Sequence, residues 1–308
     1  MGEVKRRKSG AKQELKGIKQ AEIESLLSSP DTIGEDKPGG DFYARTRSLD
    51  GVPSWLGSRL DRVVLVHRMR EVMAQVGFTR FEAMLDVDLE LSLNVEMAPL
   101  ARETTWVPAV ENRGEGIFLA FREEAIREWL GKDAVQRRGK QLEAGFGAWK
   151  KRKNLPDDKP SFPGLPYVML HSLSHLLITT LSLECGYAAS SVRERIYAGE
   201  SGYGILLYTA APGSEGTLGG LVDVGRKIEG HIRTALDAGR LCSNDPICAD
   251  HNPARVQEER FLHGAACHGC LLTSETSCER RNEFLDRSLV VPTVWGLGAE
   301  FFSFLGRV

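Results

Sequence analysis

The chain has 308 residues, of which 42% are hydrophobic and 27% are charged, and its formal net charge at pH 7 is −2. This length and composition are typical of a globular protein with one large domain or two modest ones. The near-zero charge excludes a whole-molecule field that would attract nucleic acid, and no run of about 18 uncharged apolar residues could form a membrane span. The basic N-terminus lacks the apolar core of a secretory signal, so we expect a cytoplasmic protein.

Residues 1–45 are expected to form a basic, disordered tail. They mix Lys and Arg with Glu and then enter the loop-forming run SSPDTIGEDKPGGD, which has no apolar periodicity. The basic run Lys5-Arg6-Arg7-Lys8 could touch nucleic acid, although a solvated tail is the simpler interpretation. Two domains are predicted to follow, over residues 46–155 and 156–308.

The apolar pattern of the first domain predicts helices and strands in turn. Near-helical spacing predicts a helix over residues 60–76, and strict alternation of apolar and polar residues predicts a long strand over residues 85–95. Two strands are expected on either side of a hairpin-like reversal at residues 112–114. A helix is expected over residues 123–130.

A basic stretch at residues 136–153 is the candidate nucleic-acid contact in the ordered part of the chain. Phe146 and Trp149 are interleaved with its positive charges, as in surfaces that bind phosphates and bases. A charged surface helix followed by a linker is the simpler alternative. The proline-rich residues 154–166 then mark the boundary between the domains. The candidate contacts are Arg137, Arg138, Lys150, Lys151, Arg152 and Lys153.

The second domain opens with an apolar helix that should be buried and should end at Gly186. The pattern Ser-x-x-Glu at residues 191–194 fits a capping box and predicts another short helix. Residues 204–210 are expected to form a short apolar strand. A Gly-rich turn leads from this strand into a helix that runs to about Ala238.

Five of the six cysteines fall in two short C-terminal segments, LCSNDPIC and ACHGCLLTSETSC. Thiolates placed in pairs on two turns can close a tetrahedral Zn²⁺ site, and in a reducing compartment such cysteines indicate metal binding rather than disulfides. A site of four thiolates has no open position and is structural.

Together with the strands and helices predicted above, this site predicts an α+β protein. A mixed or antiparallel sheet region is followed by a helical, zinc-stabilised C-terminal domain. The predicted ligands of this one zinc site are Cys242, Cys248, Cys267 and Cys270, with Cys278 as the alternate and His251, His263 and His268 as weaker substitutes.

His171 and His175 are four residues apart and so share one face of the apolar helix, at the spacing of two metal ligands. With a carboxylate such as Glu184 or Glu215 they could form a metal-dependent hydrolase or nuclease. Ser172, however, stands where the helical metalloprotease motif has its general base. Two histidines hydrogen-bonded within the core or an interface are the simpler interpretation.

The Gly-rich run at residues 214–220 follows a strand and precedes a helix, where an anion could bind the helix N-terminus. It lacks the Gly-Lys-Ser/Thr ending of a P-loop and the spacing of a dinucleotide-binding turn. Glycines needed for a tight turn and for close helix packing are the simpler interpretation. The residues of interest are Glu215, Gly216, Gly219 and Gly220.

Several strings resemble the DrmB family of the DISARM anti-phage defence systems. They are HSLSHLLITTLSLECGYAASSVRERIY, GILLYTAAPGSEGTLGGLV, LCSNDPIC and ACHGCLLTSETSCERRNEFLDRSLV, which look like the C-terminal half of that family, and GFTRFEA and WVPAVENRGEGIFLAF, which resemble its middle region. The resemblance covers roughly residues 60–290. The C-terminal part is similar to the zinc-binding domain named after the helicase MrfA, in which four cysteines hold Zn²⁺. It implicates Cys242, Cys248, Cys267 and Cys270, and it places the family's Gly-rich turn on Glu215, Gly216, Gly219 and Gly220.

The resemblance implies a non-catalytic zinc-binding subunit that associates with an SNF2-like, DrmA-like helicase and helps to bind DNA within that complex. Family members are much longer than this chain, which is therefore expected to be a shortened or split form. The alternative is the metal-dependent hydrolase or nuclease that uses His171 and His175. A sequence-specific DNA reader ranks last, because the cysteine region lacks the short base-reading helix of a zinc finger.

Overall fold

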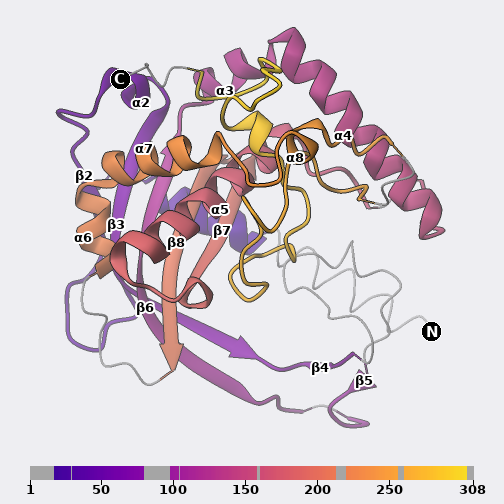
Figure 1. Cartoon of the computed structure of the whole chain (residues 1–308). Coiled ribbons are helices and arrows are strands. Elements are labelled where there is room, and N and C mark those ends of the chain that lie inside the picture. The colour runs from indigo at the N-terminus through magenta and orange to yellow at the C-terminus, as the bar shows by residue number, and fades with distance from the viewer. Residues whose placement is uncertain are drawn as a thin grey trace.

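A six-stranded sheet forms the centre of the computed structural model, which describes residues 17–28, 30–79, 98–103, 105–157, 160–212, 220–255 and 260–303. Neighbouring strands are all antiparallel, in the order β1-β2-β3-β6-β8-β7 (Figure 1). The strands are β1 (Thr32–Gly34), β2 (Phe42–Arg47), β3 (Leu60–Ala74), β6 (Ala109–Phe121), β7 (Val192–Gly199) and β8 (Gly202–Pro212). A separate two-stranded pair joins β4 (Gly77–Phe78) to β5 (Ala98–Pro99).

The apolar helix α5 (Leu165–Cys185) lies against one face of the sheet and is the centre of the main hydrophobic core. Figure 1 shows it beside α7 (Ile228–Gly239), while α6 (Gly220–Arg226) packs against β3 and β6. The predicted end at Gly186 is confirmed, because this residue has a φ of 72°, which a glycine adopts without steric cost. The other helices are α2 (Ser54–Gly57), α3 (Glu123–Leu130), α4 (Asp133–Arg152) and α8 (Ile247–Asp250), with 3₁₀ turns at Ala189–Ser191 and Arg287–Leu289.

The second face of the sheet is covered by the helical residues 17–26. Ile23 and Leu26 from this helix are buried in a smaller core with Val64 and Val66 of β3. The prediction of a disordered tail over residues 1–45 is therefore wrong for its described part, where this helix, β1 and the start of β2 are ordered. Two apolar side chains one turn apart are enough to attach a mostly polar helix to an apolar sheet face.

The helix predicted over residues 60–76 is wrong, because these residues form the long strand β3. The run Val63-Val64-Leu65-Val66 is buried on both faces of the sheet, one residue pointing into each core in alternation. A short continuous apolar run rich in β-branched residues is typical of a strand with both faces covered. The matching helical spacing in this segment was coincidental.

The hairpin predicted around Asn112–Gly114 is also wrong. Residues Ala109–Phe121 form one unbroken strand, β6, which pairs with β3 on one side and with β8 on the other. At Gly116 a Cβ atom would lie 2.7 Å from the Leu207 carbonyl oxygen of the neighbouring strand. Glycine serves here for close approach of two backbones and not for a turn.

The capping-box helix predicted at Ser191–Glu194 does not form. A 3₁₀ turn ends at Ser191, and the next residues belong to β7. The helix over residues 123–130 and the strand over residues 204–210 are confirmed, as α3 and as part of β8. The strand predicted over residues 85–95 lies outside the described residues.

The predicted α+β class with an antiparallel sheet is confirmed. Strands from all three predicted ranges lie in the same sheet, and one core extends from Leu56 to Phe302. The predicted boundary near residue 155 falls in the connection between α4 and α5. Among the described residues, no helix is long and apolar enough to cross a membrane.

Candidate metal centre

The four predicted zinc ligands, Cys242, Cys248, Cys267 and Cys270, come together in space. Their sulfur atoms all lie within 4.8 Å of one another. The Sγ–Sγ distances are 3.4 Å from Cys242 to Cys267, 3.7 Å from Cys248 to Cys270 and 3.8 Å from Cys267 to Cys270. These distances far exceed a disulfide bond of about 2.05 Å, so the sulfurs form a cluster of free thiols.

Two short turns carry the ligands. Cys242 follows the end of α7, and Cys248 lies in α8, one short turn further along the chain. Cys267 and Cys270 sit in a turn in which the Cys270 amide donates to the Cys267 carbonyl at 3.1 Å. This turn brings both sulfurs of the CxxC segment to the same side, as a pair of metal ligands requires.

The cluster fits a zinc ion. With Zn–S bonds of about 2.3 Å, tetrahedral geometry separates the sulfurs by about 3.8 Å, close to the spacings observed. Backbone N–H groups also point at the sulfurs, with Asn244 donating to Cys242 and Cys267 donating to Cys270, both at 3.4 Å. Such N–H···S contacts favour the thiolate form that binds a metal.

The thiols perturb one another strongly in the absence of a cation. The hydrogen bond with the neighbouring Cys270 sulfur, together with burial, raises the pKa of Cys248, and burial raises the pKa of Cys242 to about 11. Burial also acts to raise the pKa of Cys267, but hydrogen bonds from Asn244 and Cys242 outweigh burial and lower this pKa to about 7. A bound dication would favour the thiolate form of all four sulfurs.

Arg287 holds the first turn of the cluster in place. Its buried guanidinium pairs with Asp245 and donates to the backbone carbonyls of Gly239 and Arg240 at the end of α7. Asp245 in turn accepts a hydrogen bond from the Cys242 amide at 3.0 Å. The position of Cys242 therefore depends on a residue 45 positions downstream, as expected for outer-shell support of a metal site.

The adjacent Asp286 holds the second turn. Its carboxylate accepts hydrogen bonds from the Ala265 amide at 3.0 Å and from Arg138 Nε at 2.6 Å, and its own amide donates to Ser172 of α5 at 2.7 Å. A Cβ atom on Gly264 would lie 2.1 Å from this carboxylate, so glycine is required there. Asp286 thus connects α4 and α5 to the Cys267 turn.

The structure places His171 and His175 in a second group of metal-ligating side chains. Both histidines are fully buried, and they lie beside Glu194 of β7 and the alternate cysteine, Cys278. Glu184, one of the two carboxylates considered as a further ligand, is bonded instead to His231 on α7. Cys278 therefore belongs to this second group and not to the four-cysteine cluster.

Glu194 is the functional residue that sequence reasoning missed. The Ser-x-x-Glu pattern predicts a helix cap there, although Val192, Glu194 and Ile196 alternate with Arg193 and Arg195. In the strand β7 this alternation turns Glu194 inward between two apolar neighbours, and it is 4% exposed. A carboxylate in phase with buried apolar residues was the signal that could have identified it.

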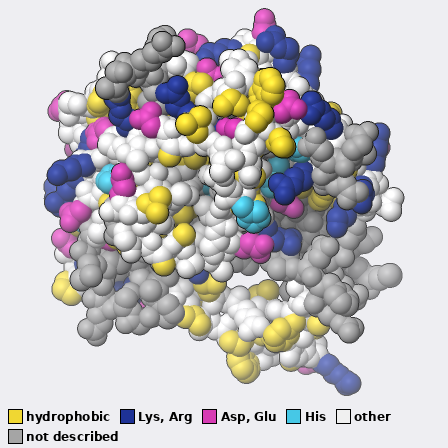
Figure 2. All heavy atoms as spheres, viewed as in Figure 1, with side chains coloured by type: hydrophobic (Ala, Val, Ile, Leu, Met, Phe, Trp, Pro, Cys, Tyr) yellow, Lys and Arg dark blue, Asp and Glu magenta, His cyan; other side chains and the backbone are white. Residues whose placement is uncertain are grey.

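The basic patch is smaller than predicted. Arg138 is 4% exposed and bonded to Asp286, and Lys150 is 9% exposed and donates to the carbonyls of Asp157 and Pro160. The prediction that both contact nucleic acid is wrong. They lie on the inner face of α4, where a buried basic side chain needs an internal partner and cannot reach a phosphate. The exposed members are Arg137, Lys151, Arg152 and Lys153. In Figure 2, Lys and Arg side chains follow the side of the molecule where Figure 1 draws α4.

Most of the Gly-rich turn, including Glu215, Gly216 and Gly219, lies outside the described residues. Gly220 is the first residue of α6. The amide of Leu221, in the first turn of α6, already donates to the buried carboxylate of Glu115 on β6 at 2.9 Å. A carboxylate of the protein itself therefore occupies this helix N-terminus.

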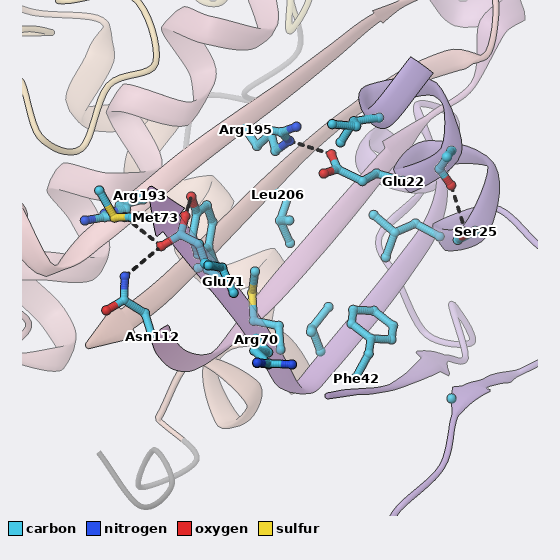
Figure 3. Close-up of a pocket in the computed structure, with 18 of the residues that line it drawn as sticks. Glu22, Ser25, Phe42, Arg70, Glu71, Met73, Asn112, Arg193, Arg195 and Leu206 are labelled. Atoms are coloured by element: carbon cyan, nitrogen blue, oxygen red, sulfur yellow. Dashed lines mark hydrogen bonds and ion pairs between the residues drawn. The ribbon is translucent and has the colours of Figure 1, made fainter. Parts of the chain in front are cut away.

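A pocket with a volume of about 1220 Å³ lies between the helical residues 17–26 and the second face of the sheet. Figure 3 shows Arg193 beside Glu71 and Arg195 beside Glu22 in this pocket. Glu71 accepts a hydrogen bond from Arg193 at 2.8 Å, and Glu22 accepts one from Arg195 at 2.5 Å. We assign it no catalytic role, since its acids are already engaged in ion pairs.

Comparison with known proteins agrees with the cysteine geometry. Residues 173–271 match the family model described as the MrfA Zn-binding domain, a range that contains all four clustered cysteines. Among solved structures, the chain is similar to the DUF1998 helicase MrfA bound to DNA, with 14% identity and a TM-score of 0.30, over 74% of this chain and 23% of that one.

One curated relative aligns with most of the chain. The DISARM protein DrmB of Bacillus paralicheniformis is 36% identical over 269 residues, which cover 86% of this chain and 46% of that protein. The chain thus spans about half the length of this relative. The expected resemblance to DrmB, including its MrfA-type zinc-binding domain, is confirmed.

Proposed function

We propose that this chain is a non-catalytic, zinc-stabilised subunit of a DISARM-like anti-phage defence complex. In this proposal it docks on an SNF2-like helicase or translocase and helps that partner to bind DNA. The structural zinc ion predicted from the four clustered cysteines holds the C-terminal part in the form that the partner recognises. The resemblance to DrmB over 86% of the chain is the observation that carries the assignment to defence.

The closed geometry of the cysteine cluster supports a structural role for this zinc. Four sulfur ligands fill a tetrahedral site and leave no position for water or substrate. The neighbouring group that could have supplied a hydrolase, His171 and His175, is 0% exposed, so a nucleic-acid substrate could not reach it. Both features favour a binding and assembly role over an enzyme that works alone.

The outer face of α4 supports the proposed help in DNA binding. Arg137, Lys140 and Lys151 are exposed along this helix, which spans Asp133–Arg152. A row of cations on one rigid helix can contact successive phosphates without reading sequence. Sequence specificity or translocation is assigned to the partner.

Co-purification tests the proposal directly. A tagged chain, expressed together with the products of its neighbouring genes, should carry an SNF2-like helicase with it in fixed stoichiometry. The complex should bind duplex DNA more tightly than the helicase alone. Recovery of the tagged chain without any helicase, combined with nuclease activity of the chain alone, would contradict the proposal and favour an enzyme.

A further inference from the structure

His171, His175, Glu194 and Cys278 form a second group of four potential metal ligands. Their ligand atoms all lie within 4.8 Å of one another. His171 Nε2 is 2.9 Å from Glu194 Oε1 and 3.1 Å from Cys278 Sγ, and His175 Nε2 is 3.3 Å from Glu194 Oε1. The two imidazole rings are nearly perpendicular, with centroids 4.6 Å apart, and both Nε2 atoms approach Glu194 Oε1.

The hydrogen bonds of the two rings determine which nitrogen is available. His171 Nδ1 lies 3.3 Å from the Phe284 carbonyl oxygen, and His175 Nδ1 lies 2.8 Å from the Leu271 carbonyl oxygen. A carbonyl oxygen only accepts, so each Nδ1 must carry the proton. A neutral imidazole has one N–H, which leaves a bare lone pair on each Nε2. This arrangement of a second ring nitrogen on a backbone carbonyl is the usual outer shell of a metal-bound histidine.

Without a cation these contacts are unfavourable. Two Nε2 lone pairs face the same carboxylate oxygen of Glu194, and all three groups are acceptors in an environment without exposure to water. Protonating one ring would still leave the other Nε2 lone pair facing the same oxygen, and protonating both would place two buried cations beside one carboxylate, at a high desolvation cost. A divalent cation resolves the conflict, because each lone pair then has an electron-pair acceptor.

The Cys278 sulfur is prepared in the same way as the sulfurs of the first cluster. The backbone amides of Arg280 and Asn282 donate to it at 3.3 and 3.1 Å. Ser174 Oγ likewise contacts Oε2 of Glu194, while Oε1 accepts a hydrogen bond from the Glu279 amide at 3.3 Å on one side and faces the histidines on the other. Each anionic ligand therefore has its own supporting donors.

We propose that His171 Nε2, His175 Nε2, Glu194 and Cys278 Sγ bind a second Zn²⁺ ion. Two nitrogens, one oxygen and one sulfur are a donor set that zinc accepts in tetrahedral geometry. The charges of the ion, the carboxylate and the thiolate sum to zero, which suits a fully buried position. Tetrahedral zinc needs N–S separations of about 3.6 Å, so the ligands move apart slightly when the ion enters.

This second site is structural, because all four ligands are buried and none of the four positions is open. It connects α5 to β7 and to the C-terminal loop that carries Cys278. It also adjoins the first cluster, since the Leu271 carbonyl that receives His175 follows Cys270 directly. His171 and Cys278 both lie outside the range that matches the MrfA Zn-binding domain.

Metal counting tests the proposal on the full chain. The protein is purified without chelators and dialysed against metal-free buffer, and bound metal is measured by plasma mass spectrometry and native mass spectrometry. We expect two equivalents of zinc in the wild type and one in each of Glu194→Gln and Cys278→Ala. The matched control, His231→Ala, changes a histidine of α7 that belongs to neither group, and it should keep two equivalents.

Cobalt substitution tells the two sites apart. Co²⁺ at the four-cysteine site gives strong thiolate-to-metal charge transfer, and Co²⁺ at the second site adds a band from one thiolate. Glu194→Gln should remove only the weaker component. One equivalent of zinc in the wild type would overturn the proposal even if every variant failed to fold. Two equivalents retained in a folded Glu194→Gln and Cys278→Ala double variant would also overturn it, while leaving the first cluster unaffected.

Discussion

The two metal centres of this protein are neighbours, but they differ in exposure and in net charge. The four-cysteine cluster is half-exposed at Cys242 and Cys270 and would carry a charge of −2 with zinc bound. The second site is fully buried and neutral with zinc bound. The difference teaches that exposure and ligand charge are matched, since a buried site must balance its charge internally and a half-exposed one need not.

The surroundings of the two sites follow the same logic. The buried guanidinium of Arg287 lies near the four-cysteine cluster. Burial acts to lower the pKa of Arg287, but Asp245, helped by the thiolates of Cys270 and Cys248, outweighs burial and raises that pKa. The second site instead supplies backbone carbonyls to its histidines. The anionic cluster is thus stabilised by a nearby cation, whereas the neutral site is supported by backbone dipoles.

The largest effect that separates the sites should come from removing one ligand of the four-cysteine cluster. Cys267→Ser should yield insoluble protein or protein without a cooperative melt, because structural zinc contributes about 10–16 kcal/mol in small zinc domains. Solubility and calorimetry check this. Treating the wild type with a strong chelator should reproduce the loss, and release from the half-exposed cluster should come before release from the buried site. A fully soluble Cys267→Ser variant with a wild-type Tm would contradict a structural role.

The next largest effect should come from Arg138→Met, which leaves Asp286 without its buried partner. Breaking a buried ion pair from one side costs about 3–5 kcal/mol. Arg138 is 4% exposed and Asp286 is fully buried, so solvent does not compensate. Urea unfolding measures the change.

Arg137→Met is the matched control for this substitution. It makes the same chemical change at the adjacent, exposed position of α4, so the free energy of unfolding should change by less than about 0.5 kcal/mol. Equal effects of the two substitutions would show that Asp286 does not depend on Arg138.

A smaller effect is expected on acidification. Burial of Asp286 acts to raise its pKa, but Arg138 and hydrogen bonds from Ser288 and Ala265 outweigh it and hold the pKa below its ordinary value. A depressed folded pKa contributes stability that is complete above the unfolded value of about 3.9 and is lost as the pH falls through the folded value. Asp286→Asn should therefore have a lower free energy of unfolding than the wild type at neutral pH. Its free energy of unfolding should also fall less as the pH is lowered. Unfolding curves at matched metal content test this, and parallel pH profiles for both proteins would contradict it.

The smallest effect on stability should come from the outer face of α4. Arg137→Glu with Lys151→Glu should leave the Tm nearly unchanged, because both side chains are exposed. In the assembled complex the same pair should weaken DNA binding and lower the slope of log K against log salt by about 0.9 per lost phosphate contact.

Arg233→Glu on α7 is the control for this pair. It reverses the charge of an exposed arginine on α7, a helix that Figure 1 draws apart from α4. The control should keep the wild-type salt slope. If the α4 pair also kept it, α4 would not contact DNA.

Sequence reasoning succeeded where the determinants of structure are local. The CxxC turn, the apolar helix α5 that ends at Gly186 and the strand β8 each depend on residues that are close in the chain. It failed where a partner strand decides the outcome. The segments that became β3, β6 and β7 each carried a plausible local signal for a helix or a turn, and pairing within the sheet overrode all three.

By itself the sequence determined that the protein has a four-cysteine zinc site, because four cysteines within 29 residues can meet through two short turns. Only the tertiary structure decided what surrounds them. Arg138 reaches Asp286 across 148 residues, and Cys278 reaches His171 across 107. Such contacts depend on how the sheet, α4 and α5 pack. The buried carboxylate of Glu194 is a potential metal ligand only because that packing places it beside two histidines and a thiol.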